Sequence, residues 1–116
     1  MSLILPTDGA VSLVEKIVNK RRGEDLVLRL YVNDVEPSKS LARAGLVEAS
    51  GFGYTPYPLP GKLWAVSTCE PVAASAPMQT FTFTGALGKV YGYFLTEAVS
   101  SGLQWAERFA GAPYEI

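Results

Sequence analysis

The clearest pattern of alternating side chains lies between Lys89 and Thr96, where apolar residues occupy both sets of alternate positions. One set is Tyr91, Tyr93 and Leu95, and the other is Val90, Gly92, Phe94 and Thr96. Successive side chains of a strand point to opposite faces of its sheet, so both faces of this strand are apolar. A strand of this kind is typical of the interior of a sheet.

A second strand is predicted directly after the first. Ser100, Ser101 and Gly102 form turns readily, and the alternation resumes beyond them as far as Ala110. One face carries Leu103, Trp105, Glu107 and Phe109, and the other carries Gln104, Ala106, Arg108 and Ala110. Residues 89–110 are therefore predicted to form a β-hairpin, with the neighbours Glu107 and Arg108 on opposite faces.

Apolar residues recur with helical spacing near the beginning of the chain. The stripe consists of Val11, Val14, Ile17 and Val18. This spacing predicts an amphipathic helix from about Gly9 to Lys20. Thr7 and Asp8 suit its N-terminal cap, and Gly23 suits its end. Residues 1–6 are expected to form an extended arm before the helix.

Short strands separated by turn residues are predicted elsewhere. They are Leu26–Val32, Leu63–Thr68 and Gln79–Thr84, with the stub of another at Pro113–Ile116. Residues 51–61 contain three prolines and three glycines, which exclude a helix or central strand and leave an extended edge segment or a loop. Pro71–Pro77 is expected to be a loop, and Ser40–Val47 is expected to form one or two helical turns at most.

These elements predict a mainly β fold, an antiparallel β-sandwich with one N-terminal helix. The 116 residues have the length of one domain, and no linker or repeat divides them. We therefore expect a single β-sandwich domain over residues 1–116. It would have an N-terminal arm at 1–6, a helix at 9–20 and a C-terminal arm at 111–116.

The composition excludes several kinds of chemistry. The chain has no histidine, which removes the commonest general base and zinc ligand, and Cys69 has no second cysteine to pair with. The net charge of -1 does not favour nucleic acid or anionic lipid as the main partner. No run approaches the ~20 apolar residues of a membrane span. The N-terminal residues do not resemble a signal peptide either.

Glu107 is the carboxylate that would have to act in a small hydrolase. No second acid accompanies it in the sequence, so a structural role is favoured, with Arg29 or Arg43 as its partner if it is buried. The sequence GALGK at Gly85–Lys89 lacks the spacing of a phosphate loop and precedes a strand, so it predicts a turn. We expect no catalytic residue, cofactor site or metal site.

Two groups of residues are candidates for a partner interface. The basic group, Lys16, Lys20, Arg21 and Arg22, suits either a solvated helix end or docking onto an acidic surface. The aromatic group is Tyr54, Tyr57 and Trp64. Core or structural positions are expected for Tyr91, Tyr93, Trp105, Glu107 and Phe109. Exposed aromatic rings also stack on sugars, so glycan binding is an alternative.

Charged residues are scarce in the middle of the chain. Between Ala49 and Gly88 they are limited to Lys62 and Glu70. An isolated soluble monomer usually distributes more charge over its surface. Strands that are partly covered in an assembly explain this scarcity, and a polar surface of Ser and Thr explains it almost as well.

The hairpin sequence resembles the C-terminal signature of a family of small structural proteins from tailed bacteriophages. In that family, a motif similar to YGYxxT…LWAERF forms the last part of a sandwich domain. The matching residues are Val90–Phe94 and Leu103–Phe109. Looser similarity follows in the same order through the helix, Leu26–Asp34, Gly53–Tyr54, Trp64 and Gln79–Gly85. Relatives commonly carry a further strand after the Arg-Phe pair, whereas this sequence has only Pro113–Ile116 there. A neighbouring chain is therefore expected to complete one sheet edge.

The resemblance implies a jelly-roll-like sandwich and a structural role in the virion. The implied protein is a capsid cement or decoration protein on the outside of an icosahedral shell, often as a trimer. Its partners would be the major capsid protein and other copies of itself, with no nucleic acid and no membrane. It would be assembled in the host cytoplasm and located on the capsid surface. The alternative is a receptor- or glycan-binding module of a phage head or tail fibre.

Overall fold

A computed structural model describes residues 6–18, 23–67, 73–76 and 78–116. The described elements are α1 (Thr7–Ile17), β1 (Leu26–Tyr31), β2 (Tyr57–Leu59), β3 (Ala65–Ser67), β4 (Ala73–Ser75), β5 (Lys89–Val90), β6 (Gly92–Glu97), β7 (Leu103–Arg108) and β8 (Tyr114–Glu115). Two short 3-10 helices, η1 (Arg43–Gly45) and η2 (Gly61–Leu63), lie between the strands. The described chain is thus mainly β with one α-helix, as the sequence predicts.

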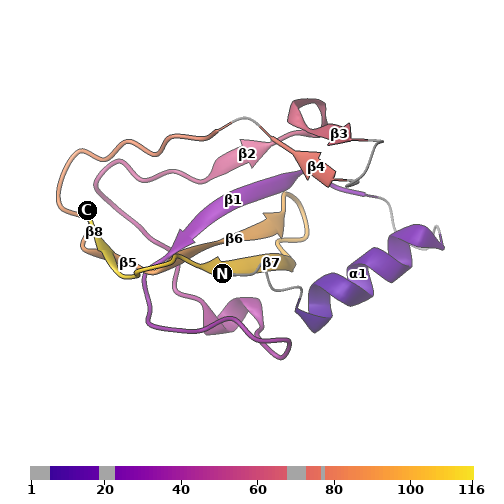
Figure 1. Ribbon diagram of the computed structural model, residues 1–116, viewed down its shortest axis with the longest axis horizontal. Helices are drawn as coiled ribbons and strands as arrows, with labels where there is room; N and C mark the ends of the chain where they lie inside the picture. Colours follow the sequence, from indigo (N-terminus) through magenta and orange to yellow (C-terminus); the bar gives the residue numbers. More distant parts are fainter. Residues whose placement is uncertain (1–5, 19–22, 68–72, 77) are drawn as a thin grey trace.

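The strands form antiparallel sheets. The largest has four strands in the order β2-β1-β6-β7, and two-stranded sheets are formed by β3 with β4 and by β5 with β8 (Figure 1). Strand β6 lies between β1 and β7, so the prediction of an interior strand is confirmed. The hairpin of β6 and β7 is confirmed as well. The expected strand stub near the C-terminal end is β8, which pairs with β5.

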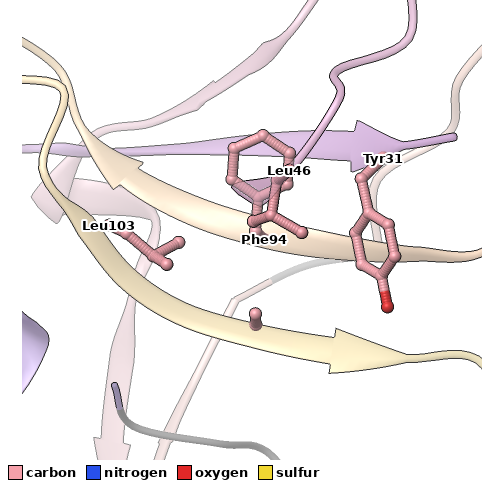
Figure 2. Packing of buried hydrophobic residues seen from close by; sticks show 5 residues of the cluster. Tyr31, Leu46, Phe94 and Leu103 are labelled. Carbon is pink, nitrogen blue, oxygen red and sulfur yellow. The ribbon is translucent and has the colours of Figure 1, made fainter. Parts of the chain in front are cut away.

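Hydrophobic residues pack on both faces of the four-stranded sheet. One cluster consists of Tyr31, Leu46, Phe94, Leu103 and Ala106, and Figure 2 shows it between β1, β6 and β7. The other consists of Leu30, Ala49 and Val90, with Tyr54, Phe81, Phe83, Tyr93 and Phe109 against it. Leu30 and Tyr31 are neighbours in β1, so the two clusters lie on opposite faces.

The predicted faces of the hairpin shift at Tyr91. This residue separates β5 from β6 and packs with the Tyr31 cluster, whereas Tyr93 packs on the opposite face. The prediction that Tyr91 and Tyr93 share a face is therefore wrong. Pairing continues through the irregularity, because the Tyr91 N–H donates to the Tyr31 carbonyl oxygen at 3.0 Å.

A β-bulge changes the face of Leu103. In the register of β6 with β7, Leu95 lies opposite Trp105 and Thr96 lies opposite Leu103, which leaves Gln104 as an extra residue. Leu103 therefore joins Ala106 in one buried cluster. The predicted common face of Leu103 and Trp105 is wrong, because alternation predicts a face only while the register is regular.

The predicted strand at Gln79–Thr84 is also wrong, since this segment forms no β-ladder. Its side chains still alternate, with Phe81 and Phe83 half-buried and the threonines exposed. The segment runs beside residues 53–58, where Pro56 and Pro58 have no N–H to donate. The alternating pattern therefore predicts which side chains face inward, but the neighbouring chain lacks N–H donors for a β-ladder.

Other boundaries differ from the predicted ones. Helix α1 begins at Thr7 and ends at Ile17, instead of extending from Gly9 to Lys20. Strand β4 lies within the segment expected to be a loop, and β2 occupies the predicted edge segment. The extended arm before Pro6 and the residues Lys20, Arg21, Arg22 and Cys69 lie outside the described residues.

Gly92 occupies a position that excludes a side chain. A Cβ atom there would overlap the carbonyl oxygen of Glu107 and lie 2.6 Å from the Tyr31 ring. We predict that Gly92→Ala lowers the free energy of unfolding by about 1–3 kcal/mol, because the tightly paired β6 and β7 must move apart. Urea denaturation measures this change.

The matched control is Gly23→Ala, because nothing lies within 4 Å of a Cβ placed there. Its unfolding midpoint should stay within error of the original protein or rise slightly. Equal midpoints for the two variants would contradict the close approach of the strands at Gly92.

Candidate functional site

Helix α1 packs against the sheet with its polar side and exposes its apolar side. Its buried residues are Gly9 and Ser12, and it contacts β7. The predicted apolar stripe faces solvent, with Val11 52%, Val14 59%, Ile17 71% and Val18 64% exposed. The helical stripe is therefore confirmed as a pattern, but it does not cover the core. It is an uncovered apolar surface, which we call the α1 apolar face.

A buried carboxylate explains this orientation. Glu97, at the end of β6, has 0% exposure and lies 3.0 Å from the ammonium nitrogen of Lys16 on α1. Its Oε1 atom accepts hydrogen bonds from Ser12 at 3.4 Å, Ser100 at 3.2 Å and Gln104 at 3.3 Å. A buried charge is very costly without such partners. The polar side of the helix must therefore face inward.

Lys16 consequently belongs to an internal ion pair. The sequence places it in a basic group that could dock onto an acidic partner, but in the structure its ammonium group lies against Glu97. The other members of that group lie outside the described residues. Sequence alone gives no signal for the pair, because Lys16 and Glu97 lie far apart in the sequence.

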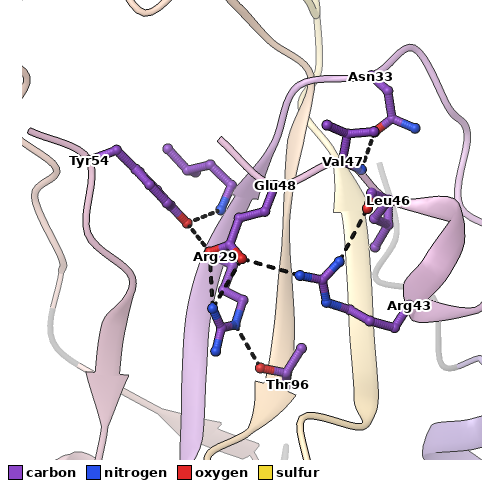
Figure 3. Close-up of polar contacts among 9 residues, drawn as sticks. Arg29, Asn33, Arg43, Leu46, Val47, Glu48, Tyr54 and Thr96 are labelled. Carbon is purple, nitrogen blue, oxygen red and sulfur yellow. Dashed lines mark hydrogen bonds and ion pairs between the residues drawn. The ribbon is translucent and has the colours of Figure 1, made fainter. Parts of the chain in front are cut away.

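A second polar cluster is centred on Glu48 (Figure 3). Its carboxylate binds the Arg29 guanidinium through both oxygens, at 3.1 and 3.0 Å, and Arg43 at 3.2 Å. The Tyr54 hydroxyl donates to Glu48 at 2.7 Å and accepts a hydrogen bond from the backbone N–H of Leu30 at 3.1 Å. These contacts join β1 to the loop that follows it, so the cluster fixes this loop against the sheet.

Arg29 and Arg43 are therefore partners of Glu48. Glu107 is half-buried, so the condition under which one of these arginines was expected to pair with it is not met. The Glu107 carboxylate instead accepts a hydrogen bond from the Tyr93 hydroxyl at 2.8 Å. Arg108 points to the other face, where it lies 2.7 Å from Asp34. The predicted opposite orientation of Glu107 and Arg108 is confirmed.

The described residues contain no group of three or more His, Cys, Asp or Glu side chains that could hold a metal ion. Among the helices of the described segments, none has the length and apolar character needed to cross a membrane. The carboxylates of Glu48 and Glu107 have partners within the fold.

An apolar groove lies over the sheet face that carries Leu30. Its volume is about 490 Å³, and its lining includes Phe81, Phe83, Val90, Phe109 and Tyr114. Tyr54 and Tyr57, which are candidates for partner contact, both pack on Phe81, with ring centroids 5.9 and 5.3 Å away. Tyr93 and Phe109 also pack together at this face, with ring centroids 6.0 Å apart.

The two tryptophans line one shallow hollow of about 270 Å³ together with Glu24 and Asp25. Trp105 comes from β7 and Trp64 from the turn before β3, and both are half-buried. Asp25 accepts a hydrogen bond from the backbone N–H of Gly61 at 3.1 Å, which holds this turn beside β1. The fold thus brings an expected core residue and a candidate interface residue to the same place.

The chain matches no protein-family model, no curated protein and no solved structure.

Burial raises the pKa of three tyrosines. The pKa values of Tyr31 and Tyr93 rise to about 12, and the hydrogen bond to the Glu107 carboxylate adds to the rise at Tyr93. Burial raises the pKa of Tyr54 further, and its hydrogen bond to Glu48 acts in the same direction. In each case the neutral phenol is the form that the folded chain holds.

We predict that stability falls as the pH rises from about 10, the usual pKa of tyrosine, towards 12. A raised phenol pKa means that the unfolded chain loses its proton first, so the stabilisation is complete below pH 10 and is lost above it. Denaturation between pH 8 and 12 measures the decline. It should be shallower in Tyr93→Phe than in Tyr114→Phe, whose tyrosine is exposed, and equal slopes would contradict the proposed role of burial.

Proposed function

We propose that this protein is a structural component of a tailed-bacteriophage virion, a cement or decoration protein that binds the outer capsid surface and stabilises the joints between capsid subunits. The α1 apolar face is the single observation that carries most weight. The resemblance of the hairpin sequence to small phage structural proteins supports the same role. The proposal assigns the protein no catalytic activity and no cofactor.

The α1 apolar face has the properties of an interface. Three branched side chains of α1 and that of its C-cap, Val18, are each more than half exposed, and they are adjacent on the surface. Contiguous exposed apolar patches commonly mark sites of contact with another protein. Fully burying a Val or Ile side chain contributes about 1.5–3 kcal/mol, so covering this face adds several kcal/mol to an association.

The opposite side of the helix supports a rigid contact. Lys16 and Ser12 hold α1 on Glu97, so the helix is already positioned before a partner arrives. A preformed surface loses little conformational entropy on binding. A cement protein makes the same contact many times over a symmetric shell, so even weak contacts accumulate. The low net charge limits repulsion between adjacent copies.

The proposed fold is a jelly-roll-like β-sandwich, with the four-stranded sheet as one layer. The apolar groove over Leu30 is where a second layer would pack, and the β5–β8 pair lies at one end of it. A neighbouring chain would complete the second layer near the C-terminal residues. The partners in this proposal are the major capsid protein and further copies of this chain, as in a trimer, on shells assembled in the host cytoplasm.

We predict that Val14→Glu abolishes binding to the capsid, because a charge would be buried in the contact. The experiment mixes purified protein with shells of the accompanying major capsid protein, measures co-sedimentation, and records the melting temperature of the shells. The original protein should raise that temperature, whereas Val14→Glu should leave it at the value of bare shells.

Val99→Glu is the matched control, because Val99 is 86% exposed in the turn between β6 and β7 and is not part of the α1 apolar face. This variant should bind shells and stabilise them as the original protein does. A protein that neither sediments with shells nor changes their melting temperature would refute the proposed role.

A receptor- or glycan-binding module is the second candidate, and the hollow that contains Trp64 and Trp105 favours it. Indole faces stack on sugar rings, and the neighbouring carboxylates of Glu24 and Asp25 can accept hydrogen bonds from hydroxyl groups. This candidate requires a ligand-sized surface site, whereas the cement role requires only an apolar contact.

Under this second candidate, Trp64→Ala removes glycan binding on an array, because half of the stacking surface is lost. Phe52→Ala is the control, since Phe52 is an exposed aromatic residue outside the hollow. Circular dichroism must show both variants folded. Absence of any bound glycan for the original protein would exclude the second candidate and leave the cement role untouched.

A further inference from the structure

The segment between β4 and β5 has an open backbone edge. Thr80, Phe81, Thr82 and Phe83 have no backbone hydrogen bond to any part of the chain that the structure describes. The segment runs along the outside of the molecule, as the orange coil in Figure 1 shows. Its backbone groups can therefore bond either to water or to another chain.

The segment is nevertheless arranged like a strand. The rings of Phe81 and Phe83 lie parallel, 6.5 Å apart, on the half-buried side, while the intervening Thr82 is exposed. At its end the Thr84 N–H donates inward to the carbonyl oxygen of Phe52 at 2.7 Å. Backbone groups alternate in direction along an extended chain, so those of Phe81 and Phe83 point to the outer edge.

The sequence of this edge is symmetric. Thr80-Phe81-Thr82-Phe83-Thr84 has the same order in both directions, with Thr82 at its centre. We propose that this segment pairs with the same segment of a second copy, antiparallel across a twofold axis at Thr82. The inference goes beyond the proposed function and does not depend on it, because the only partner is the chain itself.

The register of this pair follows from the edge geometry. Phe81 lies opposite Phe83 of the second copy, and the outward N–H and C=O groups of these residues exchange hydrogen bonds twice. The two Thr82 residues then form a non-hydrogen-bonded pair, in which the Cα atoms are ~4.5 Å apart.

The absence of charged and proline residues from this segment also favours a second copy as its partner. The sequence has no charged residue from Pro71 to Gly88, so two copies of this edge meet without repulsion. Native edge strands are usually protected by proline or by a charged side chain. Pro56 and Pro58 protect the neighbouring chain in this way, whereas Thr80–Thr84 contains neither device. An uncharged edge without such protection can pair with the same segment of a second copy in one defined register.

The expected contact is weak in isolation. Five paired residues on each chain bury less than the ~1,200 Å² of a typical stable interface. Dimers should therefore form at high protein concentration in solution. Repeated contacts on a larger assembly would strengthen the same pair by raising its effective concentration.

Disulfide trapping tests the register directly. Thr82→Cys, in a Cys69→Ser background, should give a covalent dimer under mild oxidation, because the two Thr82 Cα atoms lie within disulfide range. Thr80→Cys in the same background is the control, since its Cα atoms would be ~13 Å apart in the proposed register. Both positions are exposed, so neither change should disturb the fold.

We expect at least a tenfold faster rate of dimer formation for Thr82→Cys than for Thr80→Cys. A mixture of Thr80→Cys and Thr84→Cys proteins should also form the mixed dimer faster than either homodimer. Equal rates for all of these, or no covalent dimer of Thr82→Cys at any concentration, would overturn the proposal.

Light scattering gives a second measurement without engineered thiols. Thr82→Lys places two like charges opposite each other, so the average mass at high concentration should be lower than that of the original protein, by at most half. Val99→Lys, at a site outside the segment, should keep the mass of the original protein. An unchanged mass for Thr82→Lys would exclude this edge as the contact, whether or not the protein binds capsids.

Discussion

The buried carboxylate of Glu97 determines how the helix and the hairpin fit together. A charge with no exposure to solvent requires compensation inside the protein, and α1 brings a cation to it through Lys16. The position of Ser12 one turn earlier adds a hydroxyl to the same site. The helix cannot then turn its valines and isoleucine inward without removing these partners. The ion pair and hydrogen bonds of Glu97 at the end of β6 therefore keep the apolar face of α1 exposed to solvent.

The open edge arises from the same kind of constraint. Pro56 and Pro58 cannot donate hydrogen bonds, so the chain beside them packs through aromatic rings and does not form a ladder. The stacked rings of Phe81 and Phe83 nevertheless hold that chain extended. Its side chains are used within the fold, while its backbone is left for another partner. In both places, contacts made inside the molecule leave other groups exposed at its surface: apolar side chains on α1, and backbone hydrogen-bonding groups along the segment that contains Phe81 and Phe83.

The sequence predicts those features that depend on local periodicity. The hairpin, its interior strand and the proline-rich edge all follow from residues close together in the chain. The face of Leu103 does not, because one extra residue at Gln104 reverses the alternation. The orientation of α1 does not either, since its partner Glu97 is distant in the sequence. The alternation of Thr and Phe likewise predicts which side chains face inward. It does not predict whether the neighbouring backbone has N–H groups that can form a β-ladder.

The α1 apolar face and the open backbone edge at Thr80–Thr84 favour different kinds of partner. An apolar helix face gains free energy from any complementary apolar surface, and the direction of approach is set by shape. This suits a contact with a different protein, such as a capsid subunit. A strand edge instead imposes hydrogen bonds at fixed intervals, so register matters and a slip of one residue reverses every side chain. An edge whose sequence is symmetric about Thr82 meets that demand most simply with itself. One small chain can therefore present a face for a foreign surface and an edge for its own copy, with neither competing for the same residues.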